Sequence, residues 1–459
     1  MTMRNTLLVG SAALLRGVAA LNHIVVQGQD FADSVTGDRF EIVGVDYQPG
    51  GEQAYDPTSG VDVLSTPDAC LRDAALLQRL GANTIRTYNL NPDLNHDECA
   101  SIFNAAGIYL IIDVNVPQES INRADPSSSY NVGYLNRTFG IIDNFRSYDN
   151  TLAFFSSNEL VNDDQTSKED PPYIRAVTRD LKQYLAARGG RAIPIGYSAA
   201  DVRNILVDTT NYISCHVDGE DNDISRSDFI GVNGYSWCGP TSNFVTGQYS
   251  ELAEFYADTT IPVFFSEYGC NKPQPRYWNE VLSIYSTKDM PTFSGGLAYE
   301  WTQEANDYGL VQLNDNNTLS LLRDYNVLQS QLKKVDFGAI TTRNETAANL
   351  KPPTCSADII TSGAFDSEFN IPDQPDGVAD LIKNGKGGIQ GKLVDVGDLT
   401  VHTAVYNVDG SQVKNLAVSR VSGANTPSST TSTAAAASNG PVGGMAMGGI
   451  FGMLIWLLG

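Results

Sequence analysis

The chain has 459 residues, of which 42% are hydrophobic, and it carries a formal net charge of −23 at pH 7. This acidic balance argues against nucleic acid as a partner and suits a neutral polymer better than a polyanion. The length is too great for one small domain and fits a large barrel with appendages.

The first 20 residues are typical of a secretory signal. Arg4 supplies positive charge, Leu7–Leu15 form a short apolar core, and Val18 and Ala20 give the small-residue pattern that precedes a cleavage site. We therefore expect residues 1–20 to be a signal peptide that is removed from the mature chain.

Beyond residue 20, apolar runs alternate with amphipathic ones. Helical spacing is clearest at Cys70–Leu80, Pro172–Ala187 and Pro275–Tyr285. This alternation predicts an α/β fold, a (β/α)8 TIM barrel of roughly 300 residues, which we place at residues 21–335. The eight strands are expected at Phe40–Tyr47, Thr84–Leu90, Ile108–Val116, Thr151–Ser157, Ile193–Tyr197, Phe229–Tyr235, Ile261–Ser266 and Gly295–Trp301.

Two of these apolar runs end in a glutamate. TLAFFSSNE ends at Glu159, with Asn158 before it, and IPVFFSEYGC carries Glu267. A lone glutamate at a strand end is more often a solvent-exposed cap, but such barrels place their chemistry at the carboxyl ends of the strands. Two carboxylates there predict a pair facing one pocket, which is the arrangement that cleaves glycosidic bonds. Asn158 is positioned to bind a sugar 2-hydroxyl.

The alternation weakens after about residue 330. We expect residues 336–420 to tie back to the barrel through Cys355 and to form a small β-rich appendix, with a partly ordered spacer as the alternative. Residues 421–439 are rich in Ser, Thr and Ala and predict a disordered stalk. Residues 440–459 end in an apolar run from Ile450, about half the ~20 residues that span a bilayer. This order predicts a GPI-attachment signal, with lipid attachment at Ser438 or Asn439.

The six cysteines indicate disulfides rather than a metal site. No pair has the close spacing of zinc ligands, and the four histidines do not cluster, so we expect neither metal nor cofactor. Spacing alone does not say which cysteines pair. Asn-x-Ser/Thr triplets at Asn136, Asn316 and Asn344 predict glycosylation in the secretory pathway.

Seven different motifs lie along the predicted barrel: GVDYQPGG (44–51), IRTYNL (85–90), FFSSNEL (154–160), GYSAAD (196–201), GVNGYSWCG (231–239), FFSEYGC (264–270) and GGLAYEWTQEANDYGLV (295–311). In content and order they resemble the fungal cell-wall β-1,3-glucanosyltransferases, the Gas/Gel/Phr group of glycoside hydrolase family 72. Part of that family carries a cysteine-rich carbohydrate-binding module after the barrel. With no cysteine beyond Cys355, this chain is expected to lack it.

The resemblance implies a role for each site residue. Glu159 would be the acid/base and Glu267 the nucleophile. The implied disulfides are Cys70–Cys99, Cys215–Cys355 and Cys238–Cys270, and the implied glucan contacts are Gln48, Tyr88, Asn158, Glu159, Asp201, Tyr235 and Tyr299. Ungapped alignment puts Leu206 where the family has an arginine, so we expect either that Arg203 serves instead or that one contact is missing.

The resemblance implies a retaining enzyme that cleaves β-1,3-glucan internally. It transfers the new reducing end to the non-reducing end of another glucan and so elongates the cell-wall polymer. Its partners are donor and acceptor chains, and its place is the outer face of the plasma membrane, held by a GPI lipid only. The residues alone leave two alternatives open, a secreted endo-β-glucanase and a non-catalytic wall-binding protein.

Aromatic residues at the strand ends are candidate platforms for the acceptor sugar. They are Tyr235, Trp237, Tyr299 and Trp301, and for the two tryptophans ordinary core packing is the competing interpretation. Tyr268, which follows Glu267, is expected to point away from the site because neighbouring residues of a strand face opposite sides.

Overall fold

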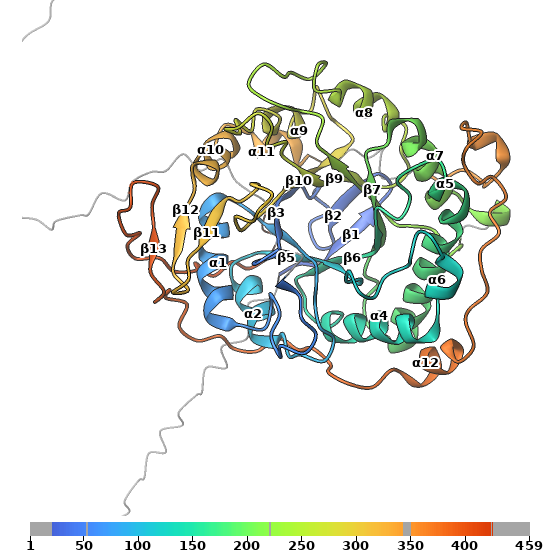
Figure 1. Ribbon diagram of the computed structural model, residues 1–459, viewed down its shortest axis with the longest axis horizontal. Helices are drawn as coiled ribbons and strands as arrows, with labels where there is room; N and C mark the ends of the chain where they lie inside the picture. Colours follow the sequence, from blue (N-terminus) through green and yellow to red (C-terminus); the bar gives the residue numbers. More distant parts are fainter. Residues whose placement is uncertain (1–20, 52–53, 220–221, 343–349, 424, 426–459) are drawn as a thin grey trace, which may run out of the picture. The chain divides into compact units, whose positions relative to one another are not determined.

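The computed structural model describes residues 21–51, 54–219, 222–342, 350–423 and 425 (Figure 1). The predicted signal peptide, most of the predicted stalk, the GPI signal with Ser438 and Asn439, and the glycosylation triplet at Asn344 lie outside the described residues. The other two triplets are described. Asn316 is exposed in a turn, and Asn136 is half-buried in a helix.

Eight parallel strands close into a barrel, with β10 pairing to β3 (Figure 1). The predicted TIM barrel is therefore confirmed, and Glu159 and Glu267 follow or end its fourth and seventh strands. In barrel order the strands are β3 (Ile42–Tyr47), β4 (Thr84–Thr87), β5 (Tyr109–Asp113), β6 (Thr151–Asn158), β7 (Ile195–Ala200), β8 (Ile230–Gly234), β9 (Val263–Tyr268) and β10 (Phe293–Ala298).

Helices cover the outside of the barrel between successive strands. Helix α1 shows how the sequence sets the ends of such a helix. Pro67 is its first residue, and Gly81 ends it with a φ of 100°, a left-handed conformation that glycine adopts without steric cost. The helices are α1 (Pro67–Leu80), α2 (Asp97–Ala105), α3 (Pro126–Ser129), α4 (Val132–Phe145), α5 (Thr166–Glu169), α6 (Pro171–Arg188), α7 (Arg203–Ser214), α8 (Tyr249–Phe255), α9 (Val281–Ile284), α10 (Arg323–Leu332), α11 (Phe337–Ile340) and α12 (Val378–Asn384), with 3-10 turns at Val217–Gly219 and Ala357–Ile359.

The helix predicted at Pro275–Tyr285 is wrong over most of its length. Only α9 is helical there, because Trp278 adopts a φ of 55°, outside the helical region. The Trp278 side chain is buried against Tyr268, with ring centroids 5.7 Å apart. The apolar spacing that suggested a helix comes instead from a loop whose large side chains fill the outer core.

Aromatic rings fill the barrel interior. Phe155, Phe229 and Phe264 pack against one another with ring centroids 5.3 to 6.1 Å apart. A hairpin of β1 (Ile24–Gln27) and β2 (Asp30–Asp33) closes the amino-terminal end of the strands, where Phe31 lies 5.5 Å from Phe229. We call this end the bottom of the barrel and the opposite end, where the strands finish, the mouth.

Residues 354–423, here called the strap, run along the outside of the barrel from α7 past α6, α4 and α2 to α1 (Figure 1). The strap is tied back to the barrel through Cys355, as predicted, but it contains little of the β-structure predicted for this segment. Within its described residues the only strand is β13 (Val405–Tyr406), which joins β11 (Val311–Leu313) and β12 (Leu319–Leu321). Its last contacts lie at the bottom, where the Val421 amide donates to the Ala105 carbonyl.

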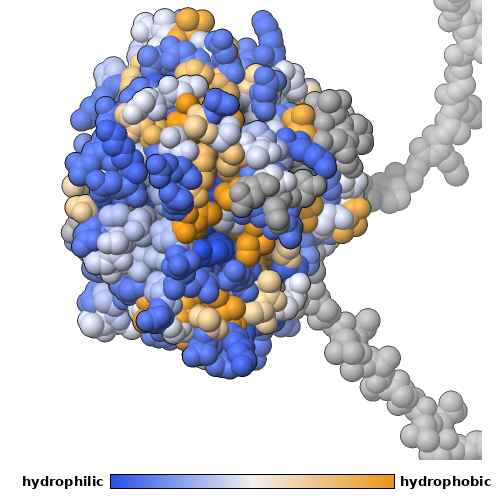
Figure 2. Space-filling view, turned by 90° about the vertical axis from the view of Figure 1, so that its right-hand side faces the viewer, coloured by the Kyte–Doolittle hydropathy of each residue, from blue (hydrophilic) through white to orange (hydrophobic). Residues whose placement is uncertain are grey.

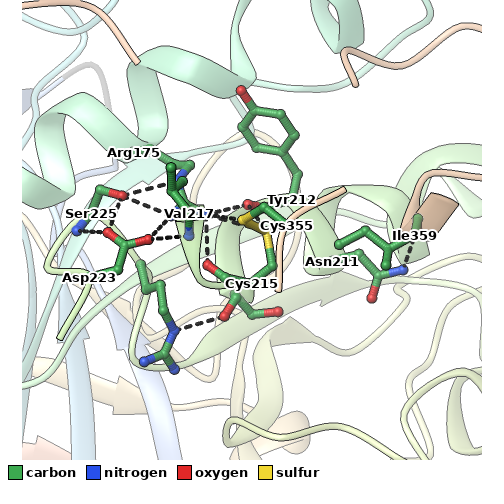
Figure 3. The surroundings of a disulfide bond; sticks show 11 residues. Arg175, Asn211, Tyr212, Cys215, Val217, Asp223, Ser225, Cys355 and Ile359 are labelled. Carbon is green, nitrogen blue, oxygen red and sulfur yellow. Dashed lines mark hydrogen bonds and ion pairs between the residues drawn. A yellow bond between two sulfur atoms is a disulfide. The ribbon is translucent and has the colours of Figure 1, made fainter. Parts of the chain in front are cut away.

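Three disulfides have the pairing that the family resemblance implied: Cys70–Cys99, Cys215–Cys355 and Cys238–Cys270. The second joins the end of α7 to the start of the strap (Figure 3). The buried Arg175 guanidinium lies beside it, donating to the Cys215 carbonyl at 3.1 Å and pairing with Asp223 at 2.6 Å. The covalent link therefore holds the strap where it begins, and the charge of the buried guanidinium beside it is paired.

Hydrophilic residues cover most of the face that carries α5 to α7, and hydrophobic residues form small groups among them (Figure 2). The strap contributes to covering the apolar surface beneath, since Phe369 stacks on Tyr212 with centroids 4.6 Å apart. Of the helices in the described part of the chain, none combines the length and apolarity that crossing a membrane requires.

Candidate active site

Both glutamates lie at the mouth, in one cleft of about 800 Å³. Of the residues predicted to contact glucan, this cleft is lined by Gln48, Tyr88, Asn158, Glu159 and Tyr299. Further lining comes from the loop that follows β5, which the sequence did not single out: Asn115, Val116, Pro117, Gln118, Ser120, Ile121, Asn122 and Arg123. The structure thus brings together side chains from barrel strands that are far apart in the sequence.

Glu267 is almost buried and is held by three donors. The Tyr88 hydroxyl donates to Oε1 at 3.0 Å, Arg86 Nη1 donates to the same oxygen at 3.2 Å, and the Tyr235 hydroxyl donates to Oε2 at 2.7 Å. Burial raises the pKa of Glu267, the charge of Arg86 lowers it, and the charge of Glu159 raises it again. The carboxylate is therefore fixed in one orientation with its negative charge compensated.

Glu159 is held less tightly and lies at the edge of the cleft. Its Oε1 accepts one hydrogen bond, from Asn233 Nδ2 at 2.8 Å. The backbone turns sharply here, with φ of 48°, and the Glu159 amide donates to the Ser198 carbonyl at 2.8 Å. Asn233 is itself oriented, because its Oδ1 accepts from the Ser198 and Ser266 hydroxyls. Glu159 keeps one oxygen for a ligand in the cleft.

The fully buried Arg86 organises the floor of the cleft. Its Nε and Nη2 donate to the two oxygens of Asp113 at 2.9 and 2.8 Å, and its Nη2 also donates to Asn158 Oδ1 at 2.9 Å. Because Asn158 Oδ1 is engaged, its Nδ2 group is the part left to donate to a ligand. Sequence reasoning missed Arg86, Asp113 and Asn233, although a charged residue inside an apolar strand is a signal for such a network.

Three tyrosines meet edge to face beside Glu267. The ring centroids of Tyr235 and Tyr299 are 6.1 Å apart, and Tyr308 lies 5.6 Å from Tyr235 and 5.2 Å from Tyr299. Trp237 and Trp301 are buried and pack on Tyr249 and Tyr325, so their interpretation as core residues holds. Tyr268 is buried too and does not line the cleft, in keeping with the expectation that it points away from the site.

The donor sets at the mouth do not resemble a metal site. Among the described residues, His, Cys, Asp and Glu side chains nowhere gather in a group of three that could hold an ion. The carboxylates here are paired instead with a guanidinium and with hydroxyl donors, which is chemistry suited to an organic ligand rich in hydroxyl groups.

The profile of a family described as "Glucanosyltransferase" matches residues 14–336, most of the chain. The chain belongs to this family. The resemblance inferred from the seven motifs is thereby confirmed.

Relatives support the same assignment. The chain is 50% identical over 410 residues to the 1,3-beta-glucanosyltransferase gel2 of Aspergillus fumigatus, a match that covers 89% of this chain and 85% of that protein. It is 47% identical to the probable 1,3-beta-glucanosyltransferase GAS3 of Saccharomyces cerevisiae, over 77% of this chain and 70% of that one.

The fold is similar to that of a solved yeast protein. A mutant of Saccharomyces cerevisiae Gas2p in complex with laminaritetraose and laminaripentaose superposes with a TM-score of 0.68 at 34% identity. The similarity covers 78% of this chain and 75% of that one.

Three of the predicted glucan contacts of this glucanosyltransferase lie outside the cleft lining: Asp201, Arg203 and Tyr235. Tyr235 is still part of the site, because its hydroxyl donates to Glu267. Arg203 forms an ion pair with Asp201, and its Nη1 donates to the Gln248 carbonyl at 3.0 Å. Leu206, which the ungapped alignment pairs with the expected family arginine, is buried in α7. Arg203 and Asp201 therefore hold each other beside the loop before α8.

Proposed function

We propose that this chain is a retaining β-1,3-glucanosyltransferase that cleaves a β-1,3-glucan internally and joins the new reducing end to the non-reducing end of an acceptor glucan. One observation carries the proposal: two glutamates of unequal environment share one cleft, Glu267 held by three donors and Glu159 by one. Double displacement needs this inequality, because one carboxylate must attack while the other moves a proton.

In the first step Glu159 protonates the glycosidic oxygen and the Glu267 carboxylate attacks the anomeric carbon. The bond to the leaving oxygen breaks, and the reducing-end fragment departs. The Tyr88 and Tyr235 hydroxyls orient the attacking carboxylate. Asn158 Nδ2 is left to bind the sugar 2-hydroxyl, an interaction that strengthens in the oxocarbenium-like transition state.

In the second step Glu159, now ionised, takes the proton from an acceptor hydroxyl, whose oxygen displaces Glu267. Water competes for the same intermediate. A bound and oriented acceptor can exceed the effective concentration of bulk water by orders of magnitude. Tyr235, Tyr299 and Tyr308 offer an apolar wall beside Glu267 on which an acceptor sugar can pack.

We further propose that the enzyme works outside the cell, on the plasma membrane and in the wall, and is held by a GPI lipid. The supporting features are in the sequence: the signal-like residues 1–20, the polar stalk and the apolar C-terminal run. Asn316, exposed between β11 and β12, is accessible for N-glycosylation.

The test is to incubate the purified enzyme with reduced laminari-oligosaccharides and to size the products. Products longer than the substrate are expected. If all products are shorter than the substrate, the protein is a hydrolase. If the substrate is unchanged, the protein binds glucan without cleaving it. Glu267→Gln serves as the control that separates this activity from a contaminating enzyme, since it should yield neither longer nor shorter chains while melting at the wild-type temperature.

A further inference from the structure

One hydroxyl at the mouth bridges two carboxyl groups. The Tyr88 oxygen lies 3.0 Å from Glu267 Oε1 and 2.9 Å from Oδ1 of Asp46, the fully buried residue near the end of β3. Both distances are those of hydrogen bonds. Asp46 does not touch the cleft, so any influence it has on the reaction passes through Tyr88 or through its charge.

The number of protons limits what this arrangement can be. A phenol carries one proton and can accept through its lone pairs. Burial raises the pKa of Tyr88 well above its usual range, so that proton stays in place. If both carboxyls were ionised, neither could donate, and only one of the two contacts could be a hydrogen bond. For both to be hydrogen bonds, one carboxyl must carry a proton and donate it to the Tyr88 oxygen.

The surrounding donors indicate which carboxyl is ionised. Glu267 accepts from Arg86 and Tyr235 in addition to Tyr88. A guanidinium has five N–H groups, and those of Arg86 donate to five acceptors: both oxygens of Asp113, the Ser266 carbonyl, Glu267 Oε1 and Asn158 Oδ1. None of them is left for Asp46.

Asp46 has no comparable support. Within the described part of the chain, its Oδ2 is buried and accepts no hydrogen bond. A buried carboxylate without donors is costly, whereas the neutral acid is not. Burial raises the pKa of the Asp46 carboxyl well above its ordinary value, and the charge of Glu267 raises it further.

We propose that Asp46 holds a proton in the resting enzyme and donates it in a hydrogen bond to Tyr88, which commits the Tyr88 proton to Glu267. Asp46 is thus a positioning residue for the nucleophile, and the proposal rests on the role assigned to Glu267 above. The titratable groups that face it come from the neighbouring strands and their ends: Arg86, Tyr88, Asp113, Tyr235, Glu267 and Tyr299.

The acid limb of kcat/KM tests this arrangement, because Glu267 must be ionised to attack and its pKa sets that limb. Asp46→Asn replaces a neutral donor by a neutral donor, so the acid limb should stay within about 0.3 pH unit of wild type. Asp46→Ala removes the donor, so the limb should rise by about 0.5 to 1 unit and the rate should fall several-fold. In a Tyr88→Phe background, Asp46→Ala should cause no further shift.

Each contrary result refutes the proposal. If Asp46 is charged in the wild type, Asp46→Asn removes a negative charge beside Glu267 and lowers the acid limb by about half a unit or more. If Asp46→Ala still shifts the acid limb in the Tyr88→Phe background, Asp46 does not act through the Tyr88 hydroxyl. If Asp46→Ala does not fold, neutron diffraction of the wild type decides, because a deuteron on Asp46 is required.

The failure of this proposal is distinguishable from that of the proposed function. Turnover by Glu267→Gln would refute the function itself. An inactive Glu267→Gln together with a lowered acid limb in Asp46→Asn would refute only the proton on Asp46.

Discussion

Each end of the barrel holds a buried arginine among acids. At the mouth, Arg86 pairs with Asp113 at 2.8 Å and with Glu267 at 3.2 Å. At the bottom, Arg39 pairs with Glu41 at 3.2 Å and donates to the Phe293 carbonyl at 2.7 Å. Burial raises the pKa of both glutamates, that of Glu41 to about 7. By charge and burial alone the two clusters are alike.

The two clusters differ in the size of the cavity beside them. The mouth cluster opens into a cleft of about 800 Å³, whereas the cavity beside Arg39 and Glu41 measures about 10 Å³, barely room for one water molecule. A shifted pKa therefore reports that a carboxyl is buried, and only access for a ligand makes it a candidate for chemistry. We therefore expect the bottom cluster to have a structural role only. Matched substitutions at the two ends of the barrel test this difference.

The largest expected effect separates the two glutamates. Glu267→Gln should lower transfer by about 10⁴-fold or more, because the amide cannot form the glycosyl intermediate. Glu41→Gln, the matched change at the bottom, should keep transfer activity. Both are measured by product sizing with laminari-oligosaccharides. Comparable losses in the two variants would mean that the clusters do not differ in function.

Glu159→Gln should cause the next largest loss of transfer activity, since a positioned acid/base group contributes about 10²- to 10⁴-fold to the rate. A β-glucan donor with a dinitrophenyl leaving group needs no protonation to depart. Formation of the glycosyl intermediate, seen as release of dinitrophenol, should therefore be restored in Glu159→Gln but not in Glu267→Gln. Equal behaviour of the two variants with this donor would remove the distinction between acid/base and nucleophile.

Glu41 should instead make the stability of the fold depend on pH. Its pKa rises from 4.5 to about 7 on folding, so the folded state binds more protons than the unfolded chain between these values, and stability falls as pH rises through this window. The loss amounts to about 3 kcal/mol at most. Glu41→Gln stays neutral, so its melting temperature relative to wild type should increase from pH 4.5 to 8. A constant difference would contradict the shift.

The barrel could be predicted because its strands are buried on both faces and form uninterrupted apolar runs. The two glutamates stood out for the same reason, since each ends such a run. Arg86, Asp113 and Asp46 were missed because their partners lie on other strands. A charged residue inside an apolar strand signals that a partner exists, but no local pattern tells which residue of another strand it is. The strap was misjudged similarly: its amides bond to distant helices, as when Lys392 donates to Asp97 at 2.9 Å, so it shows neither helical nor strand periodicity.

The smallest expected effect compares two tyrosine hydroxyls, one at each end of the barrel. Tyr235 donates to Glu267 Oε2 at 2.7 Å at the mouth, and Tyr285 donates to the Ile42 carbonyl at 2.9 Å at the bottom. Tyr235→Phe should lower kcat/KM about 10-fold, because a hydrogen bond to a charged group is lost. It should also raise the pKa of Glu267, so that the acid limb moves up by about one unit.

Tyr285→Phe is the matched control, since it removes a hydrogen bond of similar length from a tyrosine at the opposite end of the barrel. It should lower the melting temperature without moving the acid limb, because no carboxylate of the cleft accepts from Tyr285. An acid limb that moves equally in both variants would mean that the pH profile reports the stability of the barrel rather than the charge on Glu267. The same shift would then carry no information about the nucleophile.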